Sequence, residues 1–306
     1  MLRLEFRAMG CQMLVATENE SLYAEKRLNQ VPGLFANWEQ TLSRFRPDSE
    51  LNQLNDQPGK LINVSQVLWD VMQTAKLAWQ KSDGLINPAV LPMLETAGYT
   101  ETFESIAGGV GASPITTQQY ISSFERIDFN ENTHALRIPP GMRLDLGGVA
   151  KGWAAHQTML QLRDLGPVLV DSGGDIAISA PLANGEAWEV GVNNPFDRGH
   201  NFEKLFIQEG GIATSGRDHR RWQQGADQRH HVIDPRTGRP AETDLLSVTV
   251  IAEDVMNAEM AAKKMLILGS EKGLAWLDDL ENASGLAVLE NGEFLGSHRI
   301  ERYLRN

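Results

Sequence analysis

The order of its periodic segments constrains the fold of this 306-residue chain more than any other feature. Segments with strand-like patterning, in which apolar and β-branched residues alternate or cluster, lie at residues 3–17, 125–139, 168–179, 187–193, 204–208, 245–252 and 286–295. Segments with helical spacing lie at residues 20–43, 65–83, 149–165, 257–268 and 270–280. Because helices are grouped between runs of strands that short turns connect, we predict an α+β fold with mostly antiparallel sheets.

Composition restricts the class of protein. An apolar content of 42% with 22% charged residues is typical of a globular chain with a sizeable core. The chain has no low-complexity segment or linker, so we expect one domain over residues 1–306, or two intimately packed subdomains that divide near residue 140. A formal net charge of -12 argues against nucleic acid as a partner. The single cysteine, Cys11, excludes an internal disulfide and a cysteine-based zinc site.

The N-terminal sequence MLRLEFRAMGCQMLVAT lacks the long apolar core of a secretory signal. No apolar run in the chain approaches the length of a membrane span. The sequence therefore predicts a cytoplasmic protein without a transmembrane segment.

Prolines and serines mark the expected element boundaries. Pro32 and Gly33 should divide residues 20–43 into two helices. Ser65 is placed to cap the helix that follows it. The segment Gly84–Leu94 contains two prolines, and we expect a stiff loop there.

The segment Thr214–Gly238 is basic, whereas the chain as a whole is acidic. Positions 217 to 239 contain six arginines and three aspartates, which gives a local net charge of about +3. His230 and His231 are of the residue type whose ordinary pKa lies near neutrality, and Asp234–Gly238 has the residues of a tight turn. This combination suits a phosphorylated ligand. A solvated basic loop that contains a hairpin explains it equally well.

A second segment, Arg143–His156, reads as a strand that runs through Gly147 and Gly148 into a helix carrying Lys151. Glycines at such a junction let a ligand approach backbone N–H groups, and the start of a helix favours anions. We expect the helix to end at Gly166. A glycine pair alone is weak support for a ligand site.

Taken in order along the chain, six segments resemble the ApbE family of FAD:protein FMN transferases. They are LSRFRPDSELNQLN, GLINPAVLP, LDLGGVAKGWAA, SGGDI, ATSGRD and HVIDPRTG. The resemblance runs from Met9 to about Gly269. It implies two T-fold-like units packed together, FAD as substrate, release of AMP, and attachment of FMN to a threonine of an acceptor protein. Some family members hydrolyse FAD instead, and members usually use Mg²⁺.

The resemblance also implies site residues. His231 is the candidate catalytic base, with Asp234 to orient it or bind the flavin side and Lys151 near the phosphates. The implied FAD-binding residues are Met9, Asn55, Asn87, Asp145, Gly147, Gly148, Ser215, Gly216, Arg217, His231 and Arg236. The family's metal positions fall on Ala150, Glu259 and Lys263.

Two of these metal positions depart from the family pattern. Glu259 stands where the family has Asp, and Lys263 stands where it has Thr. A protonated lysine cannot ligate Mg²⁺ and repels it. One interpretation is an ordinary i,i+4 surface pair worth about 0.3–0.5 kcal/mol. The other is that the Lys263 ammonium takes the place of the metal and neutralises phosphate.

The proline-containing segment departs as well. Asn87 and Ala89 replace an Asp and a Thr, so the segment loses a charge but keeps hydrogen-bonding capacity. Three functions follow from the resemblance: an FMN transferase with an altered or absent Mg²⁺ site, a non-catalytic FAD-binding homologue, or an FAD pyrophosphatase.

Overall fold

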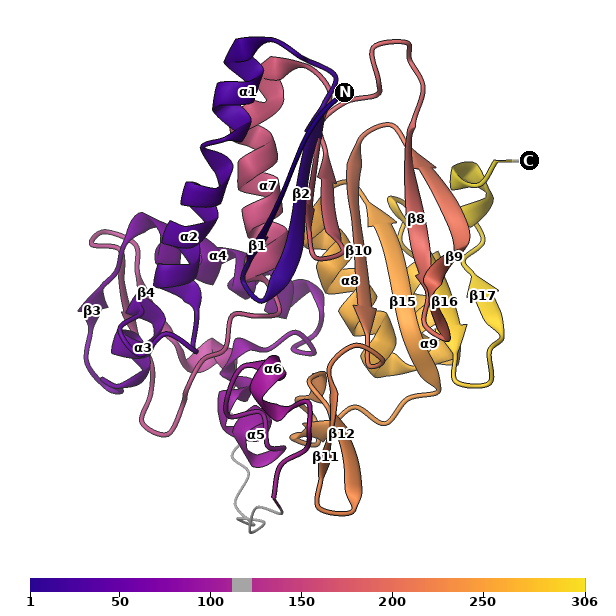
Figure 1. Ribbon diagram of the computed structural model, residues 1–306. Helices are drawn as coiled ribbons and strands as arrows, with labels where there is room; N and C mark the ends of the chain where they lie inside the picture. Colours follow the sequence, from indigo (N-terminus) through magenta and orange to yellow (C-terminus); the bar gives the residue numbers. More distant parts are fainter. Residues whose placement is uncertain (112–122, 306) are drawn as a thin grey trace. The chain divides into compact units, whose positions relative to one another are not determined.

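The computed structural model describes residues 1–111 and 123–305, which form two compact units (Figure 1). Unit 1 comprises Met1–Phe35, Lys151–Gly216 and Thr243–Asn306. Unit 2 comprises Ala36–Ala150 and Arg217–Glu242. Neither unit is a continuous stretch of sequence. The expectation of one domain with a break near residue 140 stays a prediction.

An eight-stranded sheet forms the centre of unit 1, and all its strand pairs are antiparallel. In spatial order its strands are β1 (Leu2–Ala8), β2 (Cys11–Thr17), β6 (Val168–Ser172), β7 (Asp175–Ile178), β10 (Gly210–Gly216), β15 (Leu245–Ala252), β16 (Ala283–Leu289) and β17 (Phe294–Gly296). This confirms the predicted α+β class with mostly antiparallel strands.

The two faces of this sheet are covered by different elements. The hairpin β8 (Trp188–Asn194) and β9 (Asp197–Ile207) packs on one face, where Ile212 joins its apolar cluster. Helix α8 (Val255–Leu268) packs on the other, where Ala213 meets Ala258 (Figure 1). The adjacent residues Ile212 and Ala213 of β10 therefore point to opposite faces of the sheet, as the two-residue period of a strand requires.

Further helices complete unit 1. They are α1 (Leu22–Leu28), α7 (Ala150–Leu162), α9 (Ser270–Asp278) and the 3₁₀ helices η3 (Arg163–Leu165) and η4 (Ile300–Tyr303). Helix α2 (Val31–Leu42) begins in unit 1 and ends in unit 2. Within the two described ranges, no helix has the length and apolar character needed to cross a membrane.

Unit 2 contains mostly short elements, and its core includes both aliphatic and aromatic side chains. Its helices are α3 (Glu50–Asn55), α4 (Gln66–Lys81), η1 (Pro88–Val90), α5 (Leu91–Thr96), α6 (Phe103–Ile106) and η2 (Phe124–Arg126). Its strands are β3 (Ile62–Asn63), β4 (Asp128–Asn130), β5 (Ala135–Arg137), β11 (Arg221–Gln224), β12 (Asp227–His230), β13 (Ile233–Asp234) and β14 (Arg239–Pro240). Tyr99 and Trp222 pack together in the core, with ring centroids 5.3 Å apart.

Most predicted boundaries hold, and three differ. Ser65 caps α4 by accepting a hydrogen bond from the N–H of Leu68. The two helices of residues 20–43 meet at Asn29–Gln30, not at Pro32, which occupies the first turn of α2, where a missing N–H costs nothing. The predicted loop Gly84–Leu94 is wrong: η1 and α5 lie there, each with a proline in its first turn.

The predicted strand that leads into Gly147 is also wrong. Residues 143–146 form no strand. The side-chain amide of Asn55 bonds both backbone groups of Leu144, accepting from its N–H at 2.7 Å and donating to its carbonyl at 3.0 Å. One side chain therefore satisfies the backbone groups that a neighbouring strand would otherwise satisfy.

Candidate functional site

Four charged side chains meet in unit 1, and we call them the charge quartet: Lys151, Asp175, Glu259 and Lys263. The ammonium of Lys151 pairs with Asp175 Oδ2, and the ammonium of Lys263 lies 3.5 Å from Glu259 Oε1. The carboxylate side chains are 2% and 5% exposed, and each lysine side chain is 18% exposed. The acids are therefore buried, whereas the two lysine side chains keep some exposed surface.

Local structure explains why Glu259 points inward. It lies on α8 and accepts a hydrogen bond at 3.2 Å from the backbone N–H of Gly152, in the first turn of α7. An anion is favourable at this position because the first N–H groups of a helix have no partner within it. Gly152 leaves the required space, since an added Cβ would lie 2.6 Å from Glu259 Oε2.

Burial perturbs the acid–base properties of this region. Burial raises the pKa of Glu259, with Asp175 adding to the effect and the two lysines opposing it. Burial raises the pKa of the neighbouring Asp171 to about 6. For Lys151, burial by itself would lower the pKa, but Asp175 and Glu259 raise it overall, so this side chain stays charged at neutral pH.

A magnesium ion does not fit the quartet. Mg²⁺ requires oxygen ligands in tight octahedral geometry, and both carboxylates here are already paired with ammonium groups. Two carboxylates and two ammonium groups sum to zero without any metal, and protonation of Glu259 would make the cluster positive. Across the described ranges, no group of three or more His, Cys, Asp or Glu side chains is placed to hold a metal ion.

The remaining predicted residues of unit 1 lie at strand ends. Met9 forms the turn between β1 and β2, with a φ of 48°. Ser215 and Gly216 end β10, opposite Val248 and Ser247 of β15. Ser215 is buried. The predicted hairpin break at Met9 is confirmed, while its flavin contact stays a prediction.

In unit 2, the adjacent histidines of the basic segment differ. His230 is buried; its Nδ1 accepts from the N–H of Val232 at 3.3 Å, so its Nε2 carries the proton and donates to the carbonyl of Ala241 at 3.1 Å. Burial lowers the pKa of His230 to about 4, which keeps the ring neutral. Both ring nitrogens of His230 therefore take part in hydrogen bonds within the fold. His231 is half-buried and is the better candidate base.

The turn after β13 is organised by Asp234. Its carboxylate accepts from the backbone N–H of Arg236 at 2.9 Å and from the Arg236 guanidinium at 2.9, 3.2 and 2.8 Å. Its carbonyl accepts from the N–H of Gly238 at 2.8 Å. Asp234 therefore fixes the orientation of Arg236.

Three of the family segments meet elsewhere in unit 2. Asn55 holds Leu144, and the N–H of Asp145 donates to the carbonyl of Pro88 at 2.8 Å. Asp145 Oδ1 accepts from the N–H of Gly147 at 2.9 Å, which shapes the turn that Gly148 continues. Segments far apart in the sequence thus bring Asn55, Asp145 and Gly147 together, and Asn87 lies next to Pro88, whose carbonyl binds Asp145.

Sequence reasoning missed Arg44 as part of this group. Its guanidinium Nε lies 2.7 Å from Asp145 Oδ2, a charge contact without good hydrogen-bond alignment. It donates to the carbonyl of Tyr99 at 2.8 Å and lies over the rings of Phe45 and Tyr99, at 4.0 and 4.6 Å. The side chain is only 5% exposed. The signal was its place in the segment LSRFRPDSELNQLN beside an aromatic residue.

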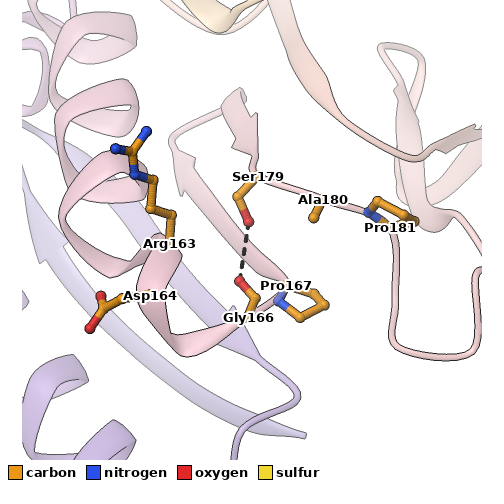
Figure 2. A pocket seen from close by; sticks show the side chains of 7 residues that line it. All are labelled: Arg163, Asp164, Gly166, Pro167, Ser179, Ala180 and Pro181. Atoms are coloured by element: carbon orange, nitrogen blue, oxygen red, sulfur yellow. Dashed lines mark hydrogen bonds between the residues drawn. The ribbon is translucent and has the colours of Figure 1, made fainter.

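One surface groove, of about 660 Å³, lies away from these residues (Figure 2). Its lining residues are Arg163, Asp164, Gly166, Pro167, Ser179, Ala180 and Pro181. Figure 2 shows Ser179 facing Gly166, and the hydroxyl donates to the Gly166 carbonyl at 3.4 Å. None of the predicted site residues lines this groove, so we assign no chemistry to it.

The fold and these motifs define a mixed α+β protein with a basic, histidine-containing segment and a buried charge quartet. The chain belongs to the ApbE family, whose sequence model matches residues 9–288. It is 28% identical over 276 residues to the FAD:protein FMN transferase of Klebsiella pneumoniae, covering 89% of this chain and 84% of that protein. It is 28% identical over 301 residues to that of Treponema pallidum, covering 91% and 81%.

Solved structures have the same fold. The ApbE protein of Thermotoga maritima superimposes with a TM-score of 0.87 at 23% identity, covering 100% of this chain and 99% of that one. The flavin transferase ApbE of Vibrio cholerae gives a TM-score of 0.78 at 22% identity, covering 99% of both chains. These likenesses confirm the fold.

Proposed function

We propose that this protein is an FAD:protein FMN transferase. The observation that carries the proposal is the match of residues 9–288 to the ApbE family, together with relatives named for this activity. The substrates are FAD and an acceptor protein with a target threonine, and the second product is AMP.

In the proposed reaction, the threonine hydroxyl attacks the FMN-side phosphorus of the FAD diphosphate. A new P–O bond joins FMN to the threonine oxygen, the P–O bond to the AMP phosphate breaks, and AMP leaves. The proton of the hydroxyl passes to His231. The geometry of His230 supports this assignment, because both ring nitrogens of His230 are already hydrogen-bonded and its pKa is low.

Cationic side chains stabilise the negative charge on the diphosphate as the bond breaks. We assign this role to Lys151, Arg217 and Arg236. Asp234 acts by holding Arg236, since its carboxylate is engaged by that residue. We assign contacts with the flavin or the nucleotide to the remaining predicted residues of each unit. In unit 1 these are Met9, Ser215 and Gly216, and in unit 2 they are Asn55, Asn87, Asp145, Gly147 and Gly148. No step is assigned to a metal bound at Ala150, Glu259 or Lys263.

The test is the intact mass of an acceptor domain after incubation with FAD and the purified protein. We expect a gain equal to one FMN, and no gain when the target threonine is changed to alanine. His231→Gln should abolish the gain, whereas His200→Gln, at an exposed residue of β9, should leave it unchanged. A full gain with His231→Gln would reject His231 as the base.

A second candidate function is FAD binding without catalysis. The lysine at a family metal position favours it, because a site without its usual cation can retain ligand while losing rate. This function predicts FAD that copurifies unchanged with the protein and neither AMP release nor acceptor labelling. The pyrophosphatase alternative predicts free FMN and AMP without labelling.

A further inference from the structure

The charge quartet provides an internal substitute for a divalent cation. We propose that Lys263, with Lys151, supplies the positive charge that faces the FAD diphosphate, so that FAD binding requires no Mg²⁺. This inference rests on the proposed function for the identity of the ligand. It makes Lys263 a phosphate-binding residue of this chain.

The charges of the quartet balance without a metal ion. Each buried carboxylate of the quartet already has an ammonium partner: Asp175 has Lys151, and Glu259 has Lys263. A divalent cation added to this cluster would have to displace both ammonium groups or lie beside them at a cost in repulsion. The quartet therefore excludes Mg²⁺ in its present form.

The position of Lys263 also suits a phosphate. Lys263 and Glu259 are one turn apart on α8, and Glu259 is fixed by the N–H of Gly152 at the start of α7. This bond holds the ammonium of Lys263 near a helix N-terminus, where positive charge and N–H donors already favour an anion. The lysine is the more exposed side chain of its pair, at 18% against 5%, so Lys263 is the member of the pair that an arriving phosphate would meet first.

Removal of the Lys263 ammonium would create a site that suits a divalent cation. Lys263→Thr keeps Glu259 and adds a hydroxyl oxygen one turn away, which turns an ammonium into a second oxygen donor. The cluster would then carry one uncompensated negative charge and two oxygen ligands, the chemistry that Mg²⁺ and Mn²⁺ prefer. The variant is expected to gain a metal requirement that the natural chain lacks.

The experiment measures two quantities on the full chain: Mn²⁺ binding by electron paramagnetic resonance, and FAD affinity by flavin fluorescence in EDTA or in Mg²⁺. For the natural chain, we expect no bound Mn²⁺ and FAD affinities that agree within about threefold in the two buffers. For Lys263→Thr, we expect bound Mn²⁺, and FAD affinity at least about tenfold weaker in EDTA than in Mg²⁺.

Two further variants serve as controls. Lys272→Thr makes the same change at an exposed position of α9 and should behave as the natural chain. Glu259→Gln combined with Lys263→Thr removes both charges and should fold without binding Mn²⁺, even if the single variant is unstable. Three results would each overturn the proposal. They are bound Mn²⁺ in the natural chain, FAD binding by the natural chain that is tenfold weaker in EDTA than in Mg²⁺, and FAD binding by Lys263→Thr that does not depend on a metal.

The measurements distinguish a failure of the proposed transferase function from a failure of the role proposed for Lys263. If FAD binds in neither buffer, the proposed function is rejected, and the Mn²⁺ measurement still decides whether the quartet excludes a metal. If acceptor labelling occurs, but both FAD binding and labelling need Mg²⁺, the transferase function stands and the role of Lys263 is rejected.

Discussion

Glu259 in α8 accepts a hydrogen bond at 3.2 Å from the backbone N–H of Gly152 in α7, although the two residues are 107 positions apart in the sequence. This contact orders the charge quartet, because the carboxylate that binds the helix start also pairs with Lys263. The contact needs a glycine at position 152, because a Cβ there would clash with Glu259, and it needs a buried acid at position 259 to accept the hydrogen bond.

Gly152→Ala should therefore destabilise unit 1. The added Cβ would lie 2.6 Å from Glu259 Oε2 and 3.4 Å from the carbonyl of Val255, and such overpacking costs about 1–3 kcal/mol. Chemical denaturation measures the change. Gly33→Ala is the matched control: nothing lies within 4 Å of its Cβ position, and an alanine inside α2 should leave stability unchanged or raise it slightly. Equal stability of Gly152→Ala and the natural chain would contradict the packing described for this junction.

The neutral state of His230 makes stability depend on pH. Its pKa is lowered from 6.5 to about 4 in the folded chain, mainly by burial. Between these values the unfolded chain binds more protons, so the stabilisation is present above about pH 6.5 and is lost as the pH falls towards 4, by up to about 3 kcal/mol. His230→Gln should flatten this part of the stability curve, measured by denaturation at several pH values. His200→Gln should not, and an unchanged slope with His230→Gln would show that other groups cause the loss.

Arg44 should hold the Asp145–Gly147 turn in place. Arg44→Met leaves the Asp145 carboxylate without its cationic partner, and breaking such a mostly buried pair costs about 3 kcal/mol. We expect a loss of thermal stability and a weaker FAD affinity. Adding Asp145→Asn removes the uncompensated charge while keeping an acceptor for the N–H of Gly147, so more than half of the stability should return. No recovery in the double variant would mean that Arg44 acts mainly through its packing on Tyr99.

Local chemistry made part of this structure predictable. The hairpin at Met9 and the cap at Ser65 depend on residues within four positions, and both were correct. The strand predicted at residues 143–146 was wrong because the partner of Leu144 is the side chain of Asn55, 89 positions away. Sequence spacing carries no record of such a contact. The prolines of the segment after Gly84 begin two short helices, a role that proline also permits.

In the candidate site, too, the sequence indicated individual residues but not the contacts between distant ones. Sequence resemblance identified Glu259 and Lys263 as altered positions, but it did not show that Glu259 binds the start of α7 or that Asp175 completes the quartet. It selected His231 rather than the adjacent His230 as the candidate base, and the structure supplies a physical reason, since both ring nitrogens of His230 are hydrogen-bonded within the fold. The roles of both groups in catalysis stay predictions.

The most direct test of the account is the ratio of AMP released to FMN attached, measured in EDTA on one reaction mixture. Chromatography gives AMP, and intact mass gives the labelled acceptor. We expect one AMP for each FMN attached, with no added metal. AMP and free FMN without labelling would indicate a pyrophosphatase, and neither product in EDTA but both in Mg²⁺ would contradict the metal-independent site.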